Sequence, residues 1–175
     1  ARIARELNKI AIYIPSPYTN EWMRARLGNN RKLSSVILKQ GQKETIVADL
    51  KQFFASKLRY EELGIPWRRG YLLFGTPGTG KTSLVTALAS DLSLNVCTLS
   101  LASPNITDER IGNLLASVPA RSVILLEDID SFFHQRQKAD AQVKLSYSGF
   151  INALDGVAAH EGSVVFLTTN HPDLI

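Results

Sequence analysis

The sequence predicts an α/β fold with three layers, in which a parallel sheet lies between two layers of helices. Two observations carry the prediction. After Pro66, short apolar segments alternate with segments of helical periodicity, and a glycine-rich turn joins the first apolar segment to the first helix. Strands that are apolar along their whole length are buried on both faces, and such strands are typical of parallel sheets covered by helices.

The elements of this core are expected to alternate along the chain. The predicted strands are Tyr71–Phe74, Asn95–Leu101, Ser122–Leu126 and Ser163–Thr169. The predicted helices are about Lys81–Ser90, Asp108–Ser117 and Leu145–Leu154. Each helix is long enough to return the chain across the sheet, so that the next strand runs parallel to the last.

The first 42 residues show a different pattern. Lys9–Ile14 is rich in β-branched residues and ends at a proline, which predicts one strand, and Leu33–Leu38 predicts a second. From Lys43, apolar residues recur at helical spacing until a glycine and a proline end the pattern. The sequence therefore predicts a boundary near residue 42, with residues 1–42 in one domain and residues 43–175 in another.

Composition places the chain among globular proteins. Of the 175 residues, 45% are hydrophobic and 21% are charged, and no apolar run approaches the ~20 residues of a membrane-spanning helix. The single cysteine, Cys97, excludes an internal disulfide and a cysteine-rich zinc site, and its position in a strand predicts a buried, unreactive thiol. The three histidines lack the spacing of metal ligands and are expected in surface loops: His134, His160 and His171.

The net charge of +4 is unevenly distributed. Residues 1–62 carry 12 Lys and Arg against 6 Asp and Glu, whereas residues 63–175 carry 8 against 10. Four basic residues gather near Trp22: Arg24, Arg26, Arg31 and Lys32. They do not form the clustered basic stripe with interspersed aromatic residues that is usual in nucleic-acid binding, so we expect a solvated loop and no nucleic-acid partner. A contact with acidic lipid head groups or with a partner protein is the alternative.

A phosphate-binding loop is predicted between the first strand and the first helix of the core. Residues 75–82 match G-x-x-x-x-G-K-[ST], in which glycines let the backbone wrap a phosphate at a helix N-terminus. Lys81 is expected to reach the β- and γ-phosphates of a nucleotide, and the Thr82 hydroxyl to bind Mg²⁺. The predicted nucleotide-binding residues are Gly75, Thr76, Pro77, Gly78, Thr79, Gly80, Lys81, Thr82 and Ser83.

Polar side chains end two of the later strands. Glu127 and Asp128 follow an apolar strand, at the sheet edge where open α/β folds bind ligands. We expect Glu127 to hold Mg²⁺ and Asp128 to act as the base that polarises the attacking water, and Asp130 to cap a helix rather than take part. Asn170 ends the last strand, where its amide would contact the γ-phosphate or the attacking water. An asparagine that merely starts a loop is the equal alternative.

With these motifs in place, the chain resembles the AAA ATPases, and within them the Bcs-type proteins, mitochondrial inner-membrane chaperones that assemble the cytochrome bc complex. The resemblance covers essentially the whole chain. Its markers are Arg31–Val36, Gly64–Leu73, Leu126–Asp130, Ser148–Val157 and Thr168–Pro172. The glutamate-then-aspartate order and the run Asn152–Gly156 distinguish this group better than the phosphate-binding loop, which many families share.

The resemblance implies a function in some detail. Residues 1–42 would belong to the family's middle domain and residues 43–175 to the large AAA subdomain. Asn170 matches the position called sensor 1. The resemblance therefore implies that Asn170 is catalytic together with Lys81, Glu127 and Asp128. The family forms homo-oligomeric rings that hold ATP and Mg²⁺ between subunits. It moves a folded client, the Rieske iron–sulfur protein, across the inner membrane, with its AAA domain on the matrix side.

Three features bear on this expectation. The segment 102–107 lacks the aromatic residue with which ring ATPases that thread unfolded chains usually grip a peptide, so threading is disfavoured. Most AAA proteins end the acidic strand with aspartate and then glutamate, and the reversed order leaves open whether Glu127 or Asp128 is the base. By resemblance, the membrane helix and targeting signal would precede Ala1. The last strand, the helical lid and the arginine fingers would follow Ile175, so residues 1–175 alone should hydrolyse ATP slowly.

Two other functions stay open at this point. One is a different P-loop NTPase, although a GTPase should carry an Asn-Lys-x-Asp motif, which is absent, and a small-molecule kinase would not require Asn170. The other is a scaffold whose ring changes shape with ATP but turns it over too slowly to do work. The reversed order of the two acids is the one feature that supports this scaffold.

Overall fold

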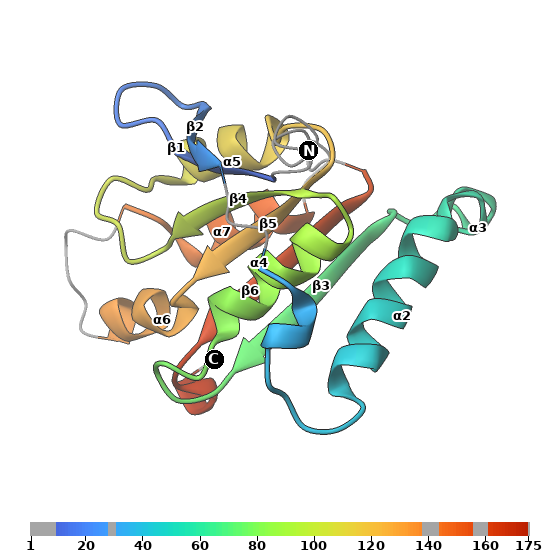
Figure 1. Ribbon diagram of the computed structural model, residues 1–175. Coiled ribbons are helices and arrows are strands. Elements are labelled where there is room, and N and C mark those ends of the chain that lie inside the picture. Colours follow the sequence, from blue (N-terminus) through green and yellow to red (C-terminus); the bar gives the residue numbers. More distant parts are fainter. Residues whose placement is uncertain (1–9, 28–30, 138–143, 156–160, 175) are drawn as a thin grey trace.

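A single six-stranded sheet runs through the computed structural model, which describes residues 10–27, 31–137, 144–155 and 161–174 (Figure 1). The strands lie in the order β2-β1-β4-β5-β6-β3. Their bounds are β1 (Ala11–Pro15), β2 (Trp22–Leu27), β3 (Arg68–Phe74), β4 (Asn95–Ser100), β5 (Ser122–Glu127) and β6 (Ser163–Thr169). Neighbouring strands are parallel except β1 and β2, which form an antiparallel hairpin at one edge.

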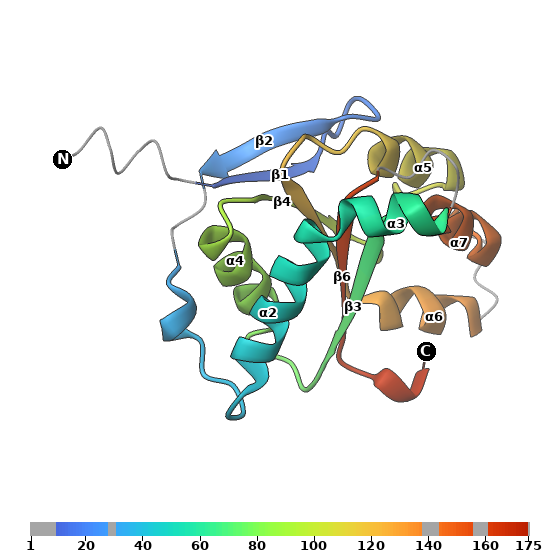
Figure 2. The ribbon, with the colours of Figure 1, turned by 90° about the vertical axis from the view of Figure 1, so that its right-hand side faces the viewer.

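Helices cover both faces of this sheet (Figure 2). On one face lie α2 (Gln42–Ala55) and α4 (Lys81–Asp91), and on the other α5 (Asp108–Ala116), α6 (Ile129–Gln137) and α7 (Tyr147–Asp155). The short helix α3 (Lys57–Leu63) follows α2, and two 3-10 turns complete the structure, η1 (Leu33–Ser35) and η2 (Pro172–Leu174). The predicted three-layer α/β fold is confirmed. Within the described ranges, no helix combines the length and the apolar character that crossing a membrane requires.

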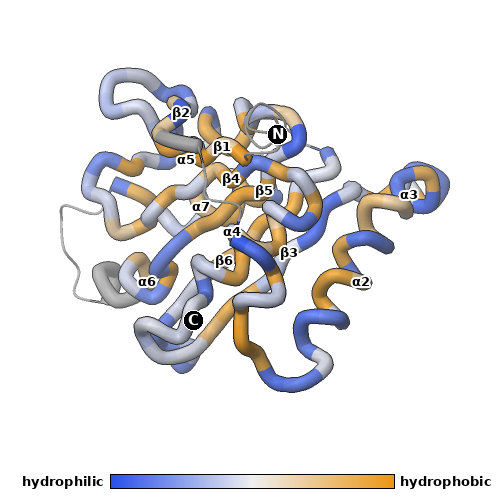
Figure 3. Tube along the Cα trace, in the orientation of Figure 1, coloured by the Kyte–Doolittle hydropathy of each residue, from blue (hydrophilic) through white to orange (hydrophobic). Residues whose placement is uncertain are grey.

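The two faces of β5 show why continuous apolar strands predict this architecture. Val123 and Leu125 pack into the core beneath α2 and α4, whereas Ile124 and Leu126 pack into the core beneath α5, α6 and α7. None of the four side chains is more than 2% exposed. Because successive side chains of a strand point to opposite faces, a strand buried on both sides needs apolar residues at every position. The apolar character of the central strands is visible along the chain trace (Figure 3).

The structure corrects the sequence-based prediction in two places. Leu33–Leu38 is not a strand, because Leu33 begins the 3-10 turn η1, and Leu33 and Val36 pack together against the core that contains α4. The range of helix α6 was not predicted, although Asp130 was expected to cap a helix. Its apolar positions Ile129 and Phe132 are three residues apart and are both buried, so the signal was present but short.

The helical pattern that starts at Lys43 forms two helices instead of one, and they meet at Ser56. The carbonyl oxygen of Phe53 accepts hydrogen bonds from the Ser56 N–H at 3.1 Å and from the Trp67 indole N–H at 3.0 Å. The Trp67 ring also packs on the Phe53 ring, with centroids 5.4 Å apart. Because a tertiary contact takes the carbonyl at the end of α2, the chain turns there before α3 begins.

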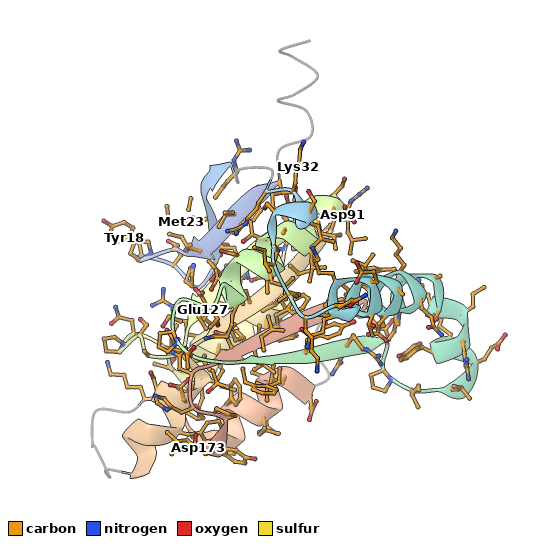
Figure 4. The ribbon with its side chains drawn as sticks, turned by 60° about the horizontal axis from the view of Figure 1, so that its bottom comes forward. Tyr18, Met23, Lys32, Asp91, Glu127 and Asp173 are labelled. Atoms are coloured by element: carbon orange, nitrogen blue, oxygen red, sulfur yellow. The ribbon has the colours of Figure 1, made fainter. Side chains whose placement is uncertain are left out.

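The β1–β2 hairpin is fastened to α5 by side chains at both ends of that helix. The Trp22 indole donates to the carbonyl oxygen of Leu114 at 2.7 Å, and the Arg110 guanidinium donates to the carbonyl oxygens of Ser16 and Asn105. At the outer end of the hairpin, Tyr18 is 94% exposed (Figure 4). The prediction of a basic loop is wrong for two of its four residues, because Arg24 and Arg26 lie on β2. The predicted boundary near residue 42 stays a prediction, although β1 and β2 share the sheet of the core.

Cys97 on β4 is fully buried, as the sequence predicts. Burial raises the pKa of its thiol to about 12, because the thiolate would lose its hydration. The thiolate is the reactive form, so the prediction of an unreactive thiol agrees with this environment. His171 is exposed, as expected, in the loop after β6. His160 lies outside the described residues, and the side chain of His134 is not described.

A contact between α5 and α7 explains a glycine within α7 and gives a stability prediction. The Asp108 carboxylate accepts hydrogen bonds from the Ser146 N–H and hydroxyl, at 2.6 and 2.7 Å. A Cβ atom at Gly149 would lie 2.2 Å from the Asp108 Cγ, whereas a Cβ at Gly112 on α5 would meet nothing within 4 Å. Gly149→Ala must therefore displace a hydrogen-bonded carboxylate. We expect it to cost about 1–2 kcal/mol of unfolding free energy, and Gly112→Ala to stabilise by up to ~1 kcal/mol.

Thermal unfolding of the two variants would measure the difference, since each replaces a helical glycine by alanine. A melting temperature that rises equally in both variants would contradict the role given to Asp108.

Candidate active site

The loop between β3 and α4 has the shape that the sequence predicts for a phosphate cradle. Gly78 and Gly80 adopt φ angles of 80° and 91°, in the left-handed region that residues with a Cβ rarely enter. The turn is closed by Thr79, whose N–H and hydroxyl both donate to the Thr76 carbonyl oxygen, at 3.4 and 2.8 Å. Helix α4 then begins at Lys81 with no side chain capping it, so the N–H groups of its first turn can bind an anion.

The other predicted nucleotide-binding residues lie in the same loop and the first turn of α4. Gly75 begins the loop with a φ of 149°, Pro77 is exposed at its surface, and Ser83 is half-buried one residue after Thr82. Their contact with a nucleotide stays a prediction.

Lys81 joins this loop to the end of β6. Its Nζ donates to the carbonyl oxygens of Gly75 at 2.7 Å and Thr76 at 3.2 Å, and to the Asn170 Oδ1 at 2.7 Å. All three partners are neutral oxygens, so the lysine charge is held in place without being neutralised by an ion pair in these contacts. A phosphate group would be a stronger partner than any of them, because hydrogen bonds between ionised groups are the stronger class.

Glu127, at the end of β5, meets the hydroxyls of two threonines. The Thr82 hydroxyl donates to one carboxylate oxygen at 2.6 Å, and the Thr98 hydroxyl on β4 donates to the other at 3.0 Å. Figure 4 shows Glu127 among the loops that follow the strands, close to the start of α4. The two residues predicted to bind a metal, Thr82 and Glu127, are thus brought into direct contact.

This pair of oxygens fits Mg²⁺. Magnesium prefers hard oxygen ligands and is usually held in proteins by one or two carboxylates, with water and substrate phosphates completing its shell. In the parts of the chain that the structure describes, no group of three or more His, Cys, Asp or Glu side chains could hold a metal ion alone. The donor set therefore suits an ion that arrives with a nucleotide.

Asp128 follows Glu127 with an unusual backbone. Its φ of 55° lies in the left-handed region, a conformation that costs free energy outside glycine and that folded proteins tend to keep at functional sites. The Asp128 N–H donates to the Thr168 hydroxyl at 3.2 Å, which holds the turn against β6. Its carboxylate accepts a long hydrogen bond, 3.4 Å, from the Asn170 side-chain amide.

Asn170 therefore lies between the two halves of the site. Its Oδ1 accepts from Lys81 and its Nδ2 donates to Asp128, so one amide group joins the phosphate-binding lysine to the second acid. The four residues predicted to be catalytic are brought together at one edge of the sheet. Their individual roles stay predictions.

Three further residues hold these groups in place, and few features of the sequence indicate this role for them. Thr98 contacts Glu127, Thr168 contacts Asp128, and Asp130 contacts the main chain of Asn170. The threonines lie within strands, where β-branched residues are common for reasons of packing alone. Asp130 was expected as a helix cap, and its spacing from Asp128 could have suggested a second role.

A cavity of about 860 Å³ opens beside the phosphate-binding loop. Its walls are the segment Leu38–Gln42, the start of α2 and the exposed edge of β3, and it extends to Lys81. A volume of this size falls in the range of small-molecule sites. The segment before α2 was not predicted to contribute to the site.

Residues 71–175 match the profile of the family described as "ATPase family associated with various cellular activities (AAA)". The chain belongs to the AAA family. It is 43% identical to the probable mitochondrial chaperone BCS1-A of Dictyostelium discoideum, over 98% of this chain and 42% of that protein. It is 45% identical to the mitochondrial chaperone BCS1 of Homo sapiens, over 82% of this chain and 36% of that protein.

These matches confirm the resemblance to the Bcs-type proteins and the prediction of an AAA ATPase domain. The chain spans about two fifths of the length of the curated relatives it matches. A solved structure described as the structural basis for katanin self-assembly has the same fold, with a TM-score of 0.61. It is 24% identical, over 83% of this chain and 48% of that one.

The contact between Thr82 and Glu127 predicts how nucleotide binding depends on magnesium. Thr82→Val removes one of the two oxygens assigned to the metal and keeps the shape of the side chain. We expect the affinity for a fluorescent ATP analogue to fall about tenfold with Mg²⁺ present, roughly 1.4 kcal/mol, and to change little in EDTA.

Thr86→Val, one turn further along α4, is the matched control, because the Thr86 hydroxyl donates to the Thr82 carbonyl oxygen and not to Glu127. Equal losses with and without Mg²⁺, or an equal loss in the control, would count against the metal assignment.

Proposed function

We propose that this protein hydrolyses ATP as a subunit of a homo-oligomeric AAA ring, and that the ring works as a chaperone and translocase of a folded client. The client proposed is the Rieske iron–sulfur protein during assembly of the respiratory bc complex. The observation that carries the ATPase part is the convergence of Lys81, Asn170 and Asp128 with the Thr82–Glu127 pair. These residues supply a lysine, a pair of oxygens for a metal ion, an acid and an amide at one edge of the sheet, a combination that supports phosphoryl transfer to water.

The roles of the residues follow from their contacts. Lys81 exchanges its neutral carbonyl partners for the β- and γ-phosphates of ATP. Thr82 and Glu127 would hold Mg²⁺, which neutralises charge on the phosphates when it is bound. The Asp128 carboxylate accepts the proton of the attacking water, and the Asn170 amide orients that water or the γ-phosphate. The adenosine lies in the cavity beside the segment Leu38–Gln42.

The reversed order of the acids is compatible with this assignment. Glu127 has a longer side chain than aspartate, and both of its oxygens are engaged by hydroxyls, which suits a fixed metal ligand better than a mobile base. Asp128 has one long hydrogen bond, and its left-handed backbone turns it away from the line of β5. These contacts favour Asp128 as the base over the alternative assignment to Glu127.

The loop after β4 supports a folded client over a threaded one. In the segment 102–107 the only large apolar residue, Ile106, is 4% exposed, whereas Ala102, Pro104 and Asn105 are exposed. A loop of this kind exposes only small side chains, without an aromatic or large aliphatic one to grip an extended peptide. The alternative, a scaffold that changes shape with ATP but hardly hydrolyses it, is favoured only by the unusual order of the acids.

Location and partners are proposed from the relatives. The names of several relatives describe them as mitochondrial chaperones, which supports a mitochondrial location. We place the AAA domain on the matrix side of the inner membrane, attached through a segment outside this chain. The ring arrangement is supported by membership of the AAA family.

The experiment that tests the proposal uses the full-length protein with Asp128→Asn, expressed at its native level. The substitution should leave ATP binding intact and lower the rate of hydrolysis at least 100-fold, because it removes the base. A client would then stay bound to the ring, and mass spectrometry of the assembly purified with ATP would identify it. Lys81→Ala, which should not bind ATP, is the control.

Recovery of a folded iron–sulfur subunit with Asp128→Asn, and not with Lys81→Ala, is the expected result. Diverse unfolded chains, or no client, would remove the assembly role and leave the ATPase. An unchanged rate of hydrolysis in Asp128→Asn would overturn the assignment of the base.

A further inference from the structure

Asp130, two residues beyond the proposed base, is buried to an unusual degree for an acid. The residue is 7% exposed, and among the residues that the structure describes it is the only charged residue that is buried. A buried charge is costly unless hydrogen bonds compensate it. A first-turn position in α6 would by itself be satisfied at the surface, so the burial of Asp130 calls for another explanation.

Most partners of Asp130 belong to the turn after β6, and its own backbone N–H also bonds to the carboxylate. Its Oδ1 accepts from the Asn170 N–H at 3.1 Å, and the Thr169 hydroxyl bonds to the same carboxylate. The Thr169 oxygen in turn accepts from the His171 N–H at 3.0 Å. Burial by itself raises the pKa of Asp130, but these N–H and O–H donors, with His171 nearby, bring the pKa below its ordinary value. Asp130 is therefore an anion around which residues 169–171 are organised.

These bonds continue the sheet beyond its last regular pair. The register between β5 and β6 ends at Leu126 and Leu167. Past that point the strands are joined by side chains: the Asp128 N–H bonds to the Thr168 hydroxyl, and the Asn170 N–H bonds to Asp130. One turn, residues 128–130, thus holds Asn170 twice, by its side-chain amide through Asp128 and by its main chain through Asp130.

We propose that Asp130 is a positioning residue for ATP hydrolysis, which fixes the main chain of Asn170 so that its amide spans from Lys81 to Asp128. The inference rests on the proposed ATPase function. The side chain of asparagine is short, so the place of its amide depends on the place of its backbone. The backbone must keep the Asn170 Oδ1 at 2.7 Å from the Lys81 Nζ and the Asn170 Nδ2 at 3.4 Å from the Asp128 Oδ1.

The test is a double-mutant cycle in the full-length protein with the variants Asp130→Ala, Asn170→Ala and both together. We expect Asp130→Ala to lower kcat about tenfold, since small displacements of reacting groups have effects of this size or larger. KM for ATP should stay within about twofold, because the phosphate-binding loop is untouched. In the Asn170→Ala background, Asp130→Ala should change kcat by less than about twofold, because residues that act through one another are not additive.

Two further variants keep the test decisive. Asp130→Asn keeps an oxygen that can accept the Asn170 N–H, so it should recover most of kcat, and it remains informative if Asp130→Ala does not fold. Asp173→Ala, which removes an exposed acid in η2, is the matched control and should match the unmodified protein. Thermal melting and binding of a fluorescent ATP analogue would show that each variant is folded and binds nucleotide.

The outcomes distinguish a failure of the positioning role of Asp130 from a failure of the catalytic role of Asn170. A full tenfold loss from Asp130→Ala in the Asn170→Ala background, or losses from Asp130→Asn as large as those from Asp130→Ala, would overturn the positioning role alone. An Asn170→Ala protein with unchanged kcat would overturn the catalytic role of Asn170 and, with it, the reason for positioning that residue.

Discussion

The parallel pairing of β6 with β3 on one side and β5 on the other is the constraint on which the site depends. Phe74, the last residue before the phosphate-binding loop, pairs with Thr169, and Leu126 pairs with Leu167. The three strands therefore end at the same level, and the residues that follow them meet. A slip of one residue in the register would turn Asn170 to the other face of the sheet and separate it from Lys81.

The site departs from the usual AAA order of acids without losing its geometry. The longer acid, Glu127, stands first and reaches the start of α4, where the Thr82 hydroxyl meets it. The shorter acid, Asp128, stands second, and its backbone is bent into the left-handed region. In this conformation the Asp128 carboxylate accepts a hydrogen bond of 3.4 Å from the Asn170 amide.

Much of the fold and the core of the site could be predicted because they depend on local signals. Apolar runs such as Val123–Leu126 specify strands buried on both faces, and Gly78 and Gly80 specify a loop that few other residues can form. The break at Ser56 could not be predicted, because a tertiary contact from Trp67 decides it, whereas helix α6 was missed because its apolar signal is short. The contact between Asp130 and Asn170 was also missed, whereas the role of Asp130 as a helix cap stays a prediction. Its partner, Asn170, is 40 residues away along the chain, and only the strand order brings the two together.

The bond between Arg110 and the hairpin has a consequence for motion. Arg110 donates at once to Asn105, in the loop after β4, and to Ser16, at the end of β1. β1 also pairs directly with β4, whose Thr98 touches Glu127. The loop after β4 and the β1–β2 hairpin are thus linked twice, by the two bonds of Arg110 and by the pairing of β1 with β4. A displacement that begins at Glu127 and reaches Asn105 would either move Ser16 as well or break the bonds made by Arg110.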